Sequence, residues 1–355
     1  MCKKCILDTD TDPDLHIEAD GVCNRCHSWE AAWSEKKKLE DQFPSIIARI
    51  KNRGRAIIGL SGGADSAWTY WIARLNDLDV TPIHFDNGYD LPVATENLRL
   101  ITEHWGDELQ TLPVDGTLFR RVQRAFLATM PNNLEIPTDH AIKAVTYKEA
   151  DKRNIYTILN GTNMATESHG SPAWTQGHAD WRYIKSVAES QGVSIDAYPH
   201  YTLLDRETWM NGIWWLSLLE YTDYHRQRAI DEMHRKCGYI DYGFKHMESR
   251  ITRFLHGYII PRRYGWDTRR SRLSAMICSG QLTRGDALRM IAHPAYPPAE
   301  MEDDKLMFCS RLGITVEQFE AYMTAPLRRY SDFQSYINDP LIRVARKAMR
   351  VIRHD

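Results

Sequence analysis

Long hydrophobic runs are missing from this sequence. The longest apolar stretch extends only from Ile213 to Leu219 and already contains a serine, whereas a membrane-spanning helix needs roughly 20 apolar residues. The N-terminus also lacks the basic-then-apolar plan of a secretory signal peptide. We therefore expect a cytoplasmic protein with no membrane span.

A surplus of charge of one sign is absent as well. The 355 residues include 45 Lys and Arg against 47 Asp and Glu, so the net charge is −2. Domains that coat nucleic acids usually carry a strong positive charge, and nucleic acid is not expected as a partner. With 43% hydrophobic and 26% charged residues, the composition is that of a globular protein of about two domains.

The cysteines are few, but their placement is informative. Four of the seven lie near the N-terminus in two Cys-x-x-Cys pairs: Cys2, Cys5, Cys23 and Cys26. Two such pairs are typical of a tetrahedral zinc site, and a redox dithiol or free thiols are the alternative. We predict a zinc ribbon that binds structural Zn²⁺. The remaining cysteines are isolated, and we expect each to be a buried small hydrophobic residue: Cys237, Cys278 and Cys309.

Cys2 has a second interpretation. Removal of Met1 would leave a thiol beside its own α-amine, which is an arrangement that can act as a nucleophile in glutamine hydrolysis. A glutaminase domain needs far more chain than the roughly 50 residues that precede the next element. The zinc interpretation is therefore preferred.

Short apolar runs alternate with amphipathic patterns over residues 56–160. The runs predict buried strands at Ala56–Leu60, Val80–Phe85, Leu109–Val114 and Ile155–Leu159. Helical patterns are predicted at residues 29–51, 68–75, 98–105, 119–130 and 139–153. This alternation predicts an α/β fold with a doubly wound parallel sheet, in which ligands bind beyond the carboxyl ends of the strands.

Beyond about residue 200 the alternation fades and the pattern becomes mostly helical. We expect three parts: a zinc-binding ribbon with a connector helix over residues 1–50, a nucleotide-binding domain over 51–205, and a mostly helical substrate- or partner-binding region over 206–355.

The segment Ser61–Ser66 reads Ser-Gly-Gly-Ala-Asp-Ser and lies between the first strand and a helix. Its glycines allow a tight turn, after which backbone N–H groups and the positive end of the helix face one anion site. Asp65 would repel a bare phosphate, so it indicates a bound cation. The lysine of the GxxxxGK[ST] loop is absent.

This segment resembles the PP-loop of the ATP pyrophosphatases, whose signature is SGGxDS after the first strand. The resemblance implies that ATP is cleaved between its α and β phosphates and that AMP is transferred to a carbonyl oxygen. It assigns ATP binding to Ser61, Gly62, Gly63, Asp65 and Ser66.

A second segment, Asn160–Glu167, is similar to a stretch of the ammonia-dependent NAD synthetases of the same superfamily. The similarity implies that Glu167 shares a Mg²⁺ ion with Asp65, and that Gly161 and Thr162 meet the nucleotide. A solvated carboxylate at the start of a helix is the alternative for Glu167. Position after the second strand suggests that Asp86 and Asn87 also meet the nucleotide, and a plain turn is equally compatible.

Residues 243–272 are strongly basic, with eight Lys and Arg against two acidic residues. Arginine binds phosphates bidentately, and the interleaved aromatic rings could stack on a base or a sugar. The alternative is a solvated basic face that pairs with acids elsewhere. We expect the stretch to bind an anionic nucleotide-linked sugar through Lys245, Arg250, Arg253, Arg262 and Arg263.

Taken in order, the cysteine pairs, the Ser61–Ser66 loop, Asn160–Glu167 and Lys245–Phe254 resemble the N-acetyl sugar amidotransferases of the WbpG/PseA type. These enzymes serve lipopolysaccharide O-antigen or nonulosonic-acid biosynthesis. The resemblance implies that an acetamido group of a nucleotide-linked N-acetyl sugar or nonulosonic acid becomes an acetamidino group. ATP would adenylate the amide oxygen, and ammonia would displace AMP. The implied catalytic residues are Asp65, Glu167, His246 and Glu248; a structural histidine is the alternative for His246.

No Gly-x-Cys-x-Gly segment provides a built-in glutaminase, since Lys236 and Tyr239 interrupt the pattern around Cys237. We therefore expect a separate HisH-like glutaminase to supply ammonia, as the resemblance also implies. The basic amphipathic stretch Leu341–Arg353 could dock this partner or pack as a terminal helix.

Two rival functions remain open. A PP-loop tRNA-modifying enzyme of the thiolation or lysidine type is disfavoured by the net negative charge and by the unpaired later cysteines. A non-catalytic interaction module is disfavoured because the loop is intact.

Overall fold

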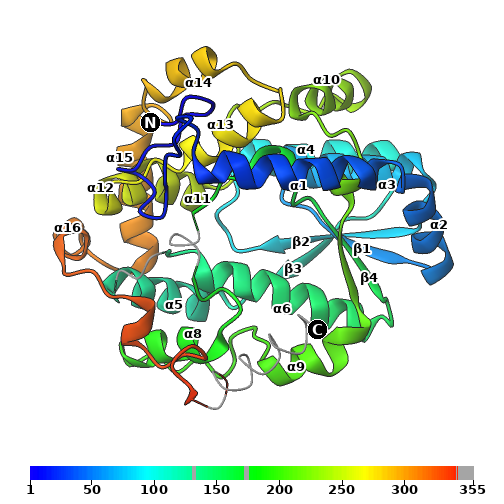
Figure 1. Cartoon of the computed structure of the whole chain (residues 1–355). Coiled ribbons are helices and arrows are strands. Elements are labelled where there is room, and N and C mark those ends of the chain that lie inside the picture. The colour runs from blue at the N-terminus through cyan, green and yellow to red at the C-terminus, as the bar shows by residue number, and fades with distance from the viewer. Residues whose placement is uncertain (130–132, 172–175, 341, 343–355) are drawn as a thin grey trace. The chain divides into compact units, whose positions relative to one another are not determined.

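A five-stranded β-sheet is the central element of the fold. The computed structural model describes residues 1–129, 133–171, 176–340 and 342, and Figure 1 shows their arrangement. The strands are β1 Ala56–Gly59, β2 Val80–Asp86, β3 Gln110–Pro113, β4 Thr157–Asn160 and β5 Trp214–Ser217. Their order is β3-β2-β1-β4-β5, and every neighbouring pair is parallel. The predicted doubly wound parallel sheet is confirmed.

The strand order reverses beside β1. From β1 the chain moves outward to β2 and β3, then crosses back to β4 on the other side of β1 and continues to β5. Ile57 of β1 accordingly lies opposite Thr81 of β2 and Ile158 of β4. In such sheets the crevice at the reversal is the place where ligands bind. The segments that follow β1 and β4 are therefore brought together at one end of the sheet.

Helices precede the sheet and connect its strands, in agreement with the predicted patterns. Those of the first half are α1 Asn24–Glu40, α2 Phe43–Arg53, α3 Ala64–Leu75, α4 Pro92–Trp105, α5 Gly116–Thr129, α6 Ile136–Lys152 and α7 Met164–Glu167. The stretch 29–51, which was predicted as one helical segment, is divided between α1 and α2. The break falls at residues 41–42, and Pro44 lies in the first turn of α2, where its missing N–H costs nothing.

The second half is mostly helical, as the sequence predicted. Its α-helices are α8 Trp181–Glu189, α9 Leu203–Glu207, α10 Arg226–Cys237, α11 Arg250–Phe254, α12 Ile260–Tyr264, α13 Arg269–Cys278, α14 Arg284–Ile291, α15 Pro298–Leu312 and α16 Val316–Thr324. A π-helical turn, Leu255–Ile259, joins α11 to α12.

The core around β1 explains why this strand forms. Ala56, Ile57 and Ile58 are completely buried, as expected for a central strand of a parallel sheet that is covered on both faces. Tyr70 and Trp71 of α3 are buried in the same core as Ile58. Burial of each large apolar side chain contributes roughly 1.5–3 kcal/mol, so this packing fixes the start of α3 against the end of β1.

Strand β5 was not predicted. It lies within the apolar stretch Ile213–Leu219, and its four residues are followed at once by a 3-10 turn over Leu218–Tyr221. As an edge strand beside β4 it buries only Leu216 fully. The sequence around it has a mostly helical pattern, and pairing with β4 decides its conformation.

The described chain divides into two compact units. The first comprises residues 1–114, 146–171 and 211–308 and holds the whole sheet; the second comprises 115–145, 172–210 and 309–355. In the second unit Asp180 organises the helices, since its carboxylate accepts hydrogen bonds from the backbone N–H groups of Tyr183 at 3.0 Å and Tyr336 at 2.7 Å. The division into 1–50, 51–205 and 206–355 remains a prediction about functional parts.

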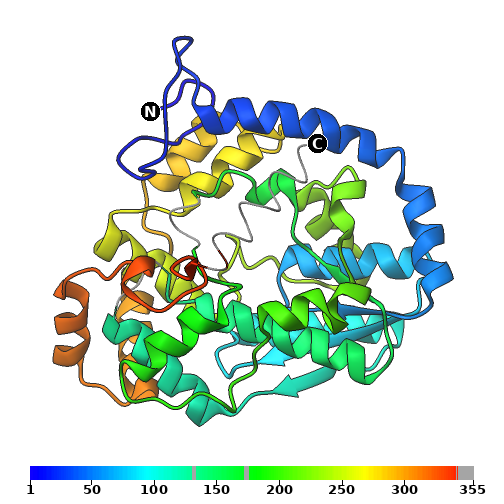
Figure 2. The ribbon, with the colours of Figure 1, turned by 60° about the horizontal axis from the view of Figure 1, so that its bottom comes forward.

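The N-terminal loop belongs to the first unit. Two views show this loop beside α13 and α14 (Figures 1 and 2), where Ile6 packs against Leu273 and Ala287. The Arg270 guanidinium donates to the Ile6 carbonyl at 2.7 Å. The loop is therefore anchored to helices that come some 270 residues later in the chain.

No helix among the described residues is long and apolar enough to cross a membrane. The stretch Leu341–Arg353, which was predicted as an amphipathic segment, lies outside the described residues except for Ile342.

Candidate active site

The loop that follows β1 forms one wall of a small cavity. Gly62 has a φ angle of 79°, and a Cβ atom at this position would lie 2.6 Å from the carbonyl oxygen of Ala94. Only glycine permits both this conformation and this close contact. Helix α3 begins immediately afterwards at Ala64, so the backbone N–H groups of its first turn add positive potential at the loop.

Serine hydroxyls hold the loop in shape. The Oγ atom of Ser61 accepts from the backbone N–H of Gly63 at 3.2 Å, and the Oγ of Ser66 donates to the Gly63 carbonyl at 3.0 Å. These hydrogen bonds fix the conformation of the loop around its two glycines.

The cavity has a volume of about 180 Å³ and joins three parts of the first unit. Its lining residues come from the loop after β1, from the segment after β4 and from residues 242–248: Ser61, Gly63, Ala64, Asp65, Ser66, Gly161, Thr162, Glu167, Tyr242, Lys245, His246 and Glu248. Ten of these twelve are residues that the sequence singled out. The structure therefore places the Ser61–Ser66 loop, the Asn160–Glu167 segment and the start of the basic stretch around one space.

The segment after β4 packs directly on the start of α3. A Cβ atom on Gly161 would lie 2.8 Å from the backbone of Asp65 and Ser66, so a larger residue would push the two segments apart. Asn163 caps α7 by accepting from the backbone N–H of Thr166 at 2.9 Å, and its side-chain amide donates to Asp65 at 3.1 Å. Asn163 lies within the predicted segment, but its role as the link to Asp65 was not predicted.

The carboxylate of Asp65 has several hydrogen-bonding partners in the cavity. It contacts the ammonium of Lys245 and accepts from the hydroxyl of Tyr224. Burial alone would raise the pKa of the Asp65 carboxyl, but the charge of Lys245, with hydrogen bonds from Lys245 and Tyr224, brings this pKa below its usual value. Asp65 is therefore ionised at neutral pH.

Lys245 lies between two carboxylates. Its Nζ atom contacts Asp65 and lies 2.5 Å from Glu167, while its side chain is only 12% exposed. Burial alone would lower the pKa of Lys245, but the charges of Asp65 and Glu167 raise it above the ordinary value. One cation thus neutralises both carboxylates that the sequence assigned to Mg²⁺.

The donor set fits a magnesium ion. The carboxylates of Asp65 and Glu167 reach a single point, because one ammonium contacts both, and carboxylate oxygens suit Mg²⁺. The ammonium of Lys245 occupies the position between the two carboxylates. A Mg²⁺ ion bound at this position would therefore displace the ammonium. Lys245 also lines a neighbouring cavity.

Glu248 and His246 bring two titratable groups to the same cavity. A short antiparallel pairing between Asp90 and Ser249 holds the segment, and the carbonyl of Glu248 accepts from the backbone N–H of Leu91 at 2.9 Å. Burial raises the pKa of the Glu248 carboxyl to about 7. Among the described residues, none forms a hydrogen bond with the Oε2 atom of Glu248. The Oε1 atom lies close to the Ser61–Ser66 loop: a Cβ atom added at Gly63 would be 2.7 Å from it.

His246 has a φ angle of 65°, which is unusual for a residue with a side chain. Burial, with the charges of Arg272 and Lys245, holds the pKa of His246 well below its usual value. The imidazole is therefore neutral at pH 7, with one nitrogen able to accept a proton. Such backbone strain is common at functional sites.

Tyr242 was not predicted as a site residue. Its hydroxyl accepts from the backbone N–H of Ala64 at 3.0 Å, so it binds one of the N–H groups at the start of α3. Burial raises the pKa of Tyr242 well above the ordinary value, and the phenol remains neutral. No local pattern around Tyr242 could have identified it, because its partner lies 178 residues earlier.

A second cavity of about 480 Å³ shares Lys245 with the first. It is lined by Thr166, His225, Arg226, Gln227, Asp241, Gly243, Phe244, Lys245, Arg269, Arg272, Met276, Gln281, Leu282, Met290, Pro294 and Ala295. Its lining includes four cationic side chains and one acidic residue; of the four, Lys245 pairs with Asp65 and Glu167, and Arg269 pairs with Asp267. Its size is within the range of cavities that hold small molecules. Arg226 lies outside the basic stretch and was not predicted.

The cations of the second cavity are held in place by backbone carbonyls. Arg226 donates to the carbonyl of Gly243 at 2.8 Å, and Arg269 to that of His293 at 2.8 Å. Arg272 donates to the carbonyl of Lys245 at 3.2 Å. Arg269 also forms an ion pair with the carboxylate of Asp267 at 2.7 Å, and Arg226 lies 3.8 Å from that of Asp241. The three arginines are thus fixed in position where they line the cavity.

The other predicted substrate-binding arginines lie outside both cavities. Arg250 and Arg253 form ion pairs with the fully buried carboxylate of Asp304, at 2.7 Å and 2.6 Å. Arg262 stacks on the ring of Tyr258, with 3.7 Å between guanidinium and centroid. Arg263 lies in α12, half-buried. The structure thus brings Lys245, but not these four arginines, to the cavities.

Asp86 and Asn87 form the turn after β2. The carboxylate of Asp86 accepts from the N–H of Gly88 at 2.7 Å, and the Asn87 side chain accepts from the N–H of Tyr89 at 3.1 Å. Neither lines the 180 Å³ cavity. Their observed role is that of turn residues.

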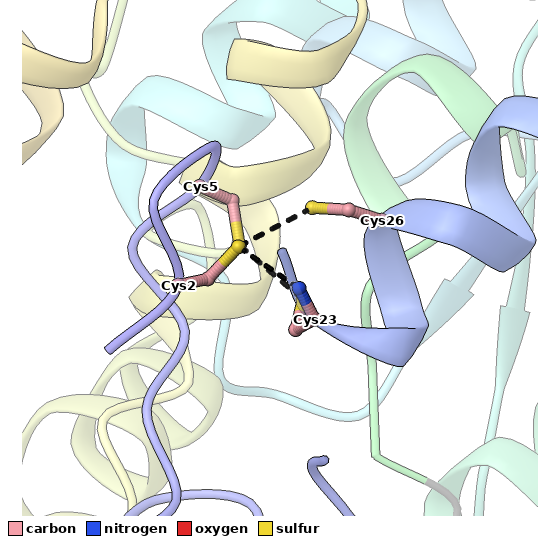
Figure 3. Close-up of side chains that lie close together, drawn as sticks. All are labelled: Cys2, Cys5, Cys23 and Cys26. Atoms are coloured by element: carbon pink, nitrogen blue, oxygen red, sulfur yellow. Dashed lines mark hydrogen bonds between the residues drawn. The ribbon is translucent and has the colours of Figure 1, made fainter. Parts of the chain in front are cut away.

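The four N-terminal cysteines gather in one place. Cys2 and Cys5 come from the N-terminal loop, Cys23 and Cys26 from the start of α1, and their side chains point toward one another (Figure 3). All four are completely buried, and their sulfur atoms lie within 4.8 Å of one another. The sulfur atoms of Cys2 and Cys26 are 4.0 Å apart, and those of Cys5 and Cys23 are 3.8 Å apart.

These separations fit zinc. A tetrahedral ion with Zn–S bonds of about 2.3 Å has S–S edges of about 3.8 Å. Backbone N–H groups also point at the sulfurs, from Cys23 to Cys2 at 3.2 Å and from Leu7 to Cys5 at 3.4 Å. Such donors stabilise thiolates. The predicted four-cysteine cluster is confirmed, and its donor set suits Zn²⁺.

Comparison with known proteins connects the chain to one family. Residues 248–348 match the model of the C-terminal domain of WbpG-like lipopolysaccharide biosynthesis proteins. This match confirms the family that the order of motifs predicted. No curated protein matches the chain.

Two solved structures show a weaker likeness. The NH₃-dependent NAD synthetase of Campylobacter jejuni is 15% identical over 59% of this chain and 99% of its own, with a TM-score of 0.30. The U34-tRNA thiolase NcsA of Methanococcus maripaludis, solved with its [4Fe-4S] cluster, is 13% identical over 84% of this chain and 94% of its own, with a TM-score of 0.32. TM-scores this low support no functional inference.

Proposed function

Because residues 248–348 belong to the WbpG-like family of lipopolysaccharide biosynthesis proteins, we propose that this chain is an ATP-dependent N-acetyl sugar amidotransferase. It converts an acetamido group of a nucleotide-linked N-acetyl sugar or nonulosonic acid into an acetamidino group. The product serves bacterial surface-polysaccharide biosynthesis, and the reaction takes place in the cytoplasm.

One observation carries this proposal. The 180 Å³ cavity around the Ser61–Ser66 loop and the larger cavity share Lys245, which supports a proposed ATP site beside a proposed acceptor site. Adenylyl transfer needs such proximity, because the acceptor must approach the α-phosphorus of ATP.

The chemistry explains why ATP is required. An amide carbon is a poor electrophile and its oxygen a poor leaving group. In the proposed reaction the acetamido oxygen attacks the α-phosphorus and pyrophosphate departs. Ammonia then adds to the carbon, AMP leaves with the oxygen, and loss of a proton gives the acetamidine. The N–H groups of the loop and of the start of α3 bind the phosphates.

The residues of the cavity have distinct proposed roles. Asp65 and Glu167 hold Mg²⁺, which when bound supplies positive charge against the phosphates. Lys245, displaced by that ion, turns its ammonium to the acceptor side. Glu248, with a pKa raised to about 7 by burial, is the group that can take the proton lost by the attacking ammonia. The neutral His246 can accept a hydrogen bond from the ammonia and so orient it.

The larger cavity is the proposed acceptor site. Arg226, Arg269 and Arg272 bind the phosphates of a nucleotide carrier, and Phe244 offers an apolar surface. Arg250 and Arg253 contribute indirectly, since they fasten α11 to Asp304 of α15. The ammonia comes from a separate HisH-like glutaminase.

Release of AMP and pyrophosphate tests this proposal. The purified chain is incubated with ATP, Mg²⁺, ammonium and each of a panel of nucleotide-linked acetamido sugars and nonulosonic acids. We expect AMP formation only with one class of acceptor, and no AMP from an Asp65→Asn variant that remains folded. AMP formed only when tRNA is added would contradict the proposal and favour RNA modification.

A further inference from the structure

Two further side chains that can bind a metal, His169 and Cys278, lie beside Cys26 of the four-cysteine cluster. Among the described residues, Cys26, His169 and Cys278 offer three ligand atoms within 4.8 Å of one another. Cys26 belongs to the first turn of α1, His169 follows α7, and Cys278 ends α13. Cys278 was expected to be an isolated buried hydrophobe; instead its sulfur is half-buried beside two other ligand atoms.

The distances match three corners of a tetrahedron around a single ion. The sulfur atoms of Cys26 and Cys278 are 3.7 Å apart, and Nε2 of His169 lies 3.5 Å from Cys278 and 3.8 Å from Cys26. Zinc bonds of about 2.3 Å to sulfur and about 2.05 Å to nitrogen give S–S edges of about 3.8 Å and S–N edges of about 3.6 Å. All three separations agree with these edges to within about 0.2 Å.

The histidine is oriented as a ligand should be. Nδ1 of His169 lies 3.1 Å from the hydroxyl of Ser168, so a proton on Nδ1 leaves the lone pair of Nε2 facing the sulfurs. Metal-binding histidines usually have such a partner for the other nitrogen. The surrounding segments are also joined, since Ser279 donates to the carbonyl of Ala165 at 2.9 Å.

Cys26 belongs to both ligand sets. Its sulfur is 4.0 Å from Cys2 within the four-cysteine cluster and 3.7 Å from Cys278 outside it. One ion cannot take all five cysteines in tetrahedral geometry. A thiolate with two lone pairs can bridge two ions, and two divalent cations nearly balance the charge of five thiolates. The close spacing of the sulfurs leaves room for single ions rather than for a multi-iron cluster.

We propose that the chain binds a second Zn²⁺ ion through the sulfurs of Cys26 and Cys278 and Nε2 of His169, with the Cys26 thiolate bridging it to the zinc of the four-cysteine site. Water completes its coordination. His169 lies two residues after Glu167, which lines the ATP cavity. The ion therefore fastens the Glu167 segment to the zinc ribbon and to α13.

Zinc counting on the intact chain tests the inference independently of any enzymatic activity. The wild-type protein, purified with added Zn²⁺ and freed of loosely bound metal by gel filtration, is analysed by native mass spectrometry and by elemental analysis. We expect two zinc ions per wild-type chain and one in Cys278→Ser and in His169→Ala. Cys237→Ser is the matched control, because Cys237 donates to the carbonyl of Met233 and lies outside both ligand sets; it should retain two.

A Cys278→His variant guards against a merely structural effect. Histidine keeps a metal ligand at this position, so this variant should again bind two zinc ions. If Cys278→Ser lost zinc only because it disturbed the packing around residue 278, Cys278→His would bind one ion as well. The inference is wrong if the wild-type chain binds one ion, if Cys278→Ser retains two, or if the protein shows the broad visible absorption of an iron–sulfur cluster instead of zinc.

Discussion

Replacement of Lys245 by methionine tests the electrostatic arrangement of the proposed ATP site. In the wild type the ammonium lies between the carboxylates of Asp65 and Glu167. Methionine keeps much of the length of the side chain but removes the charge. Asp65 and Glu167 then face each other without a counterion, and their mutual repulsion destabilises the folded chain.

The magnitude follows from burial. The side chains of Lys245 and Asp65 are only 12% and 11% exposed, and loss of one partner of a buried ion pair costs about 3–5 kcal/mol. At about 2–4 °C per kcal/mol for a unit of this size, a loss of about 3 kcal/mol lowers the melting temperature by roughly 6–12 °C. Binding of Mg²⁺ should restore much of this loss, by about 2.7 kcal/mol at a hundredfold excess over Kd.

Thermal unfolding with and without Mg²⁺ measures both effects. Lys38→Met is the matched control, because Lys38 forms an exposed ion pair with Glu35 in which the side chains are 68% and 71% exposed; such a pair contributes less than about 1 kcal/mol. We expect Mg²⁺ to stabilise Lys245→Met more than the wild type, where the ion must displace the ammonium. Equal melting temperatures for the two variants, or an equal Mg²⁺ effect in Lys245→Met and wild type, would refute the reasoning.

Three further predictions concern the loop, the acid group and the nitrogen source. Gly62→Ala should abolish ATP binding, measured by calorimetry, because its Cβ would meet Ala94 at 2.6 Å; Gly106→Ala, which also has a positive φ but open space, should cost about 1 kcal/mol and bind ATP normally. Glu248 has a folded pKa of about 7, above its ordinary value of 4.5, so its contribution to stability is complete below pH 4.5 and is lost as the pH rises through 7. Melting temperatures between pH 5 and 8 should therefore fall less steeply for Glu248→Gln than for the wild type, and parallel curves would count against the raised pKa. The isolated chain should form product with ammonium and release no glutamate from glutamine; glutaminase activity of this chain alone would disprove the need for a partner.

Local sequence patterns were sufficient for most of the sheet. Strands β1 to β4 lie within about two residues of the apolar runs that predicted them, because each run is bounded by turn residues; β1 and β4 are also buried in the sheet, whereas the edge strand β3 is partly exposed. Strand β5 was missed because it lies in a part of the chain whose pattern is mostly helical, and pairing with β4 decides its conformation.

The site was predictable where one short segment carries the chemistry. The Ser61–Ser66 loop and Glu167 follow directly from their positions after β1 and β4, and both line the cavity. Tyr224, Tyr242 and Arg226 could not be found in this way, because each meets its partners through contacts between distant segments.

The number of charges in the basic stretch could not show which of its arginines line a cavity and which pair with acidic residues. Arg250 and Arg253 meet Asp304 more than 50 residues later, whereas Arg269 and Arg272 of the same stretch line the larger cavity. Only the fold decides which of these cations line a cavity. The same holds for Cys278, which lies 252 residues from Cys26 in sequence and 3.7 Å from it in space.

Mass spectrometry of the acceptor after incubation with ATP, Mg²⁺ and ¹⁵N-labelled ammonium tests the central claim most directly. The account predicts that one acetamido oxygen is replaced by a labelled NH group, with one AMP and one pyrophosphate formed for each product molecule. An unchanged mass for every nucleotide-linked sugar and nonulosonic acid, although Asp65-dependent AMP is formed with another acceptor, would contradict it.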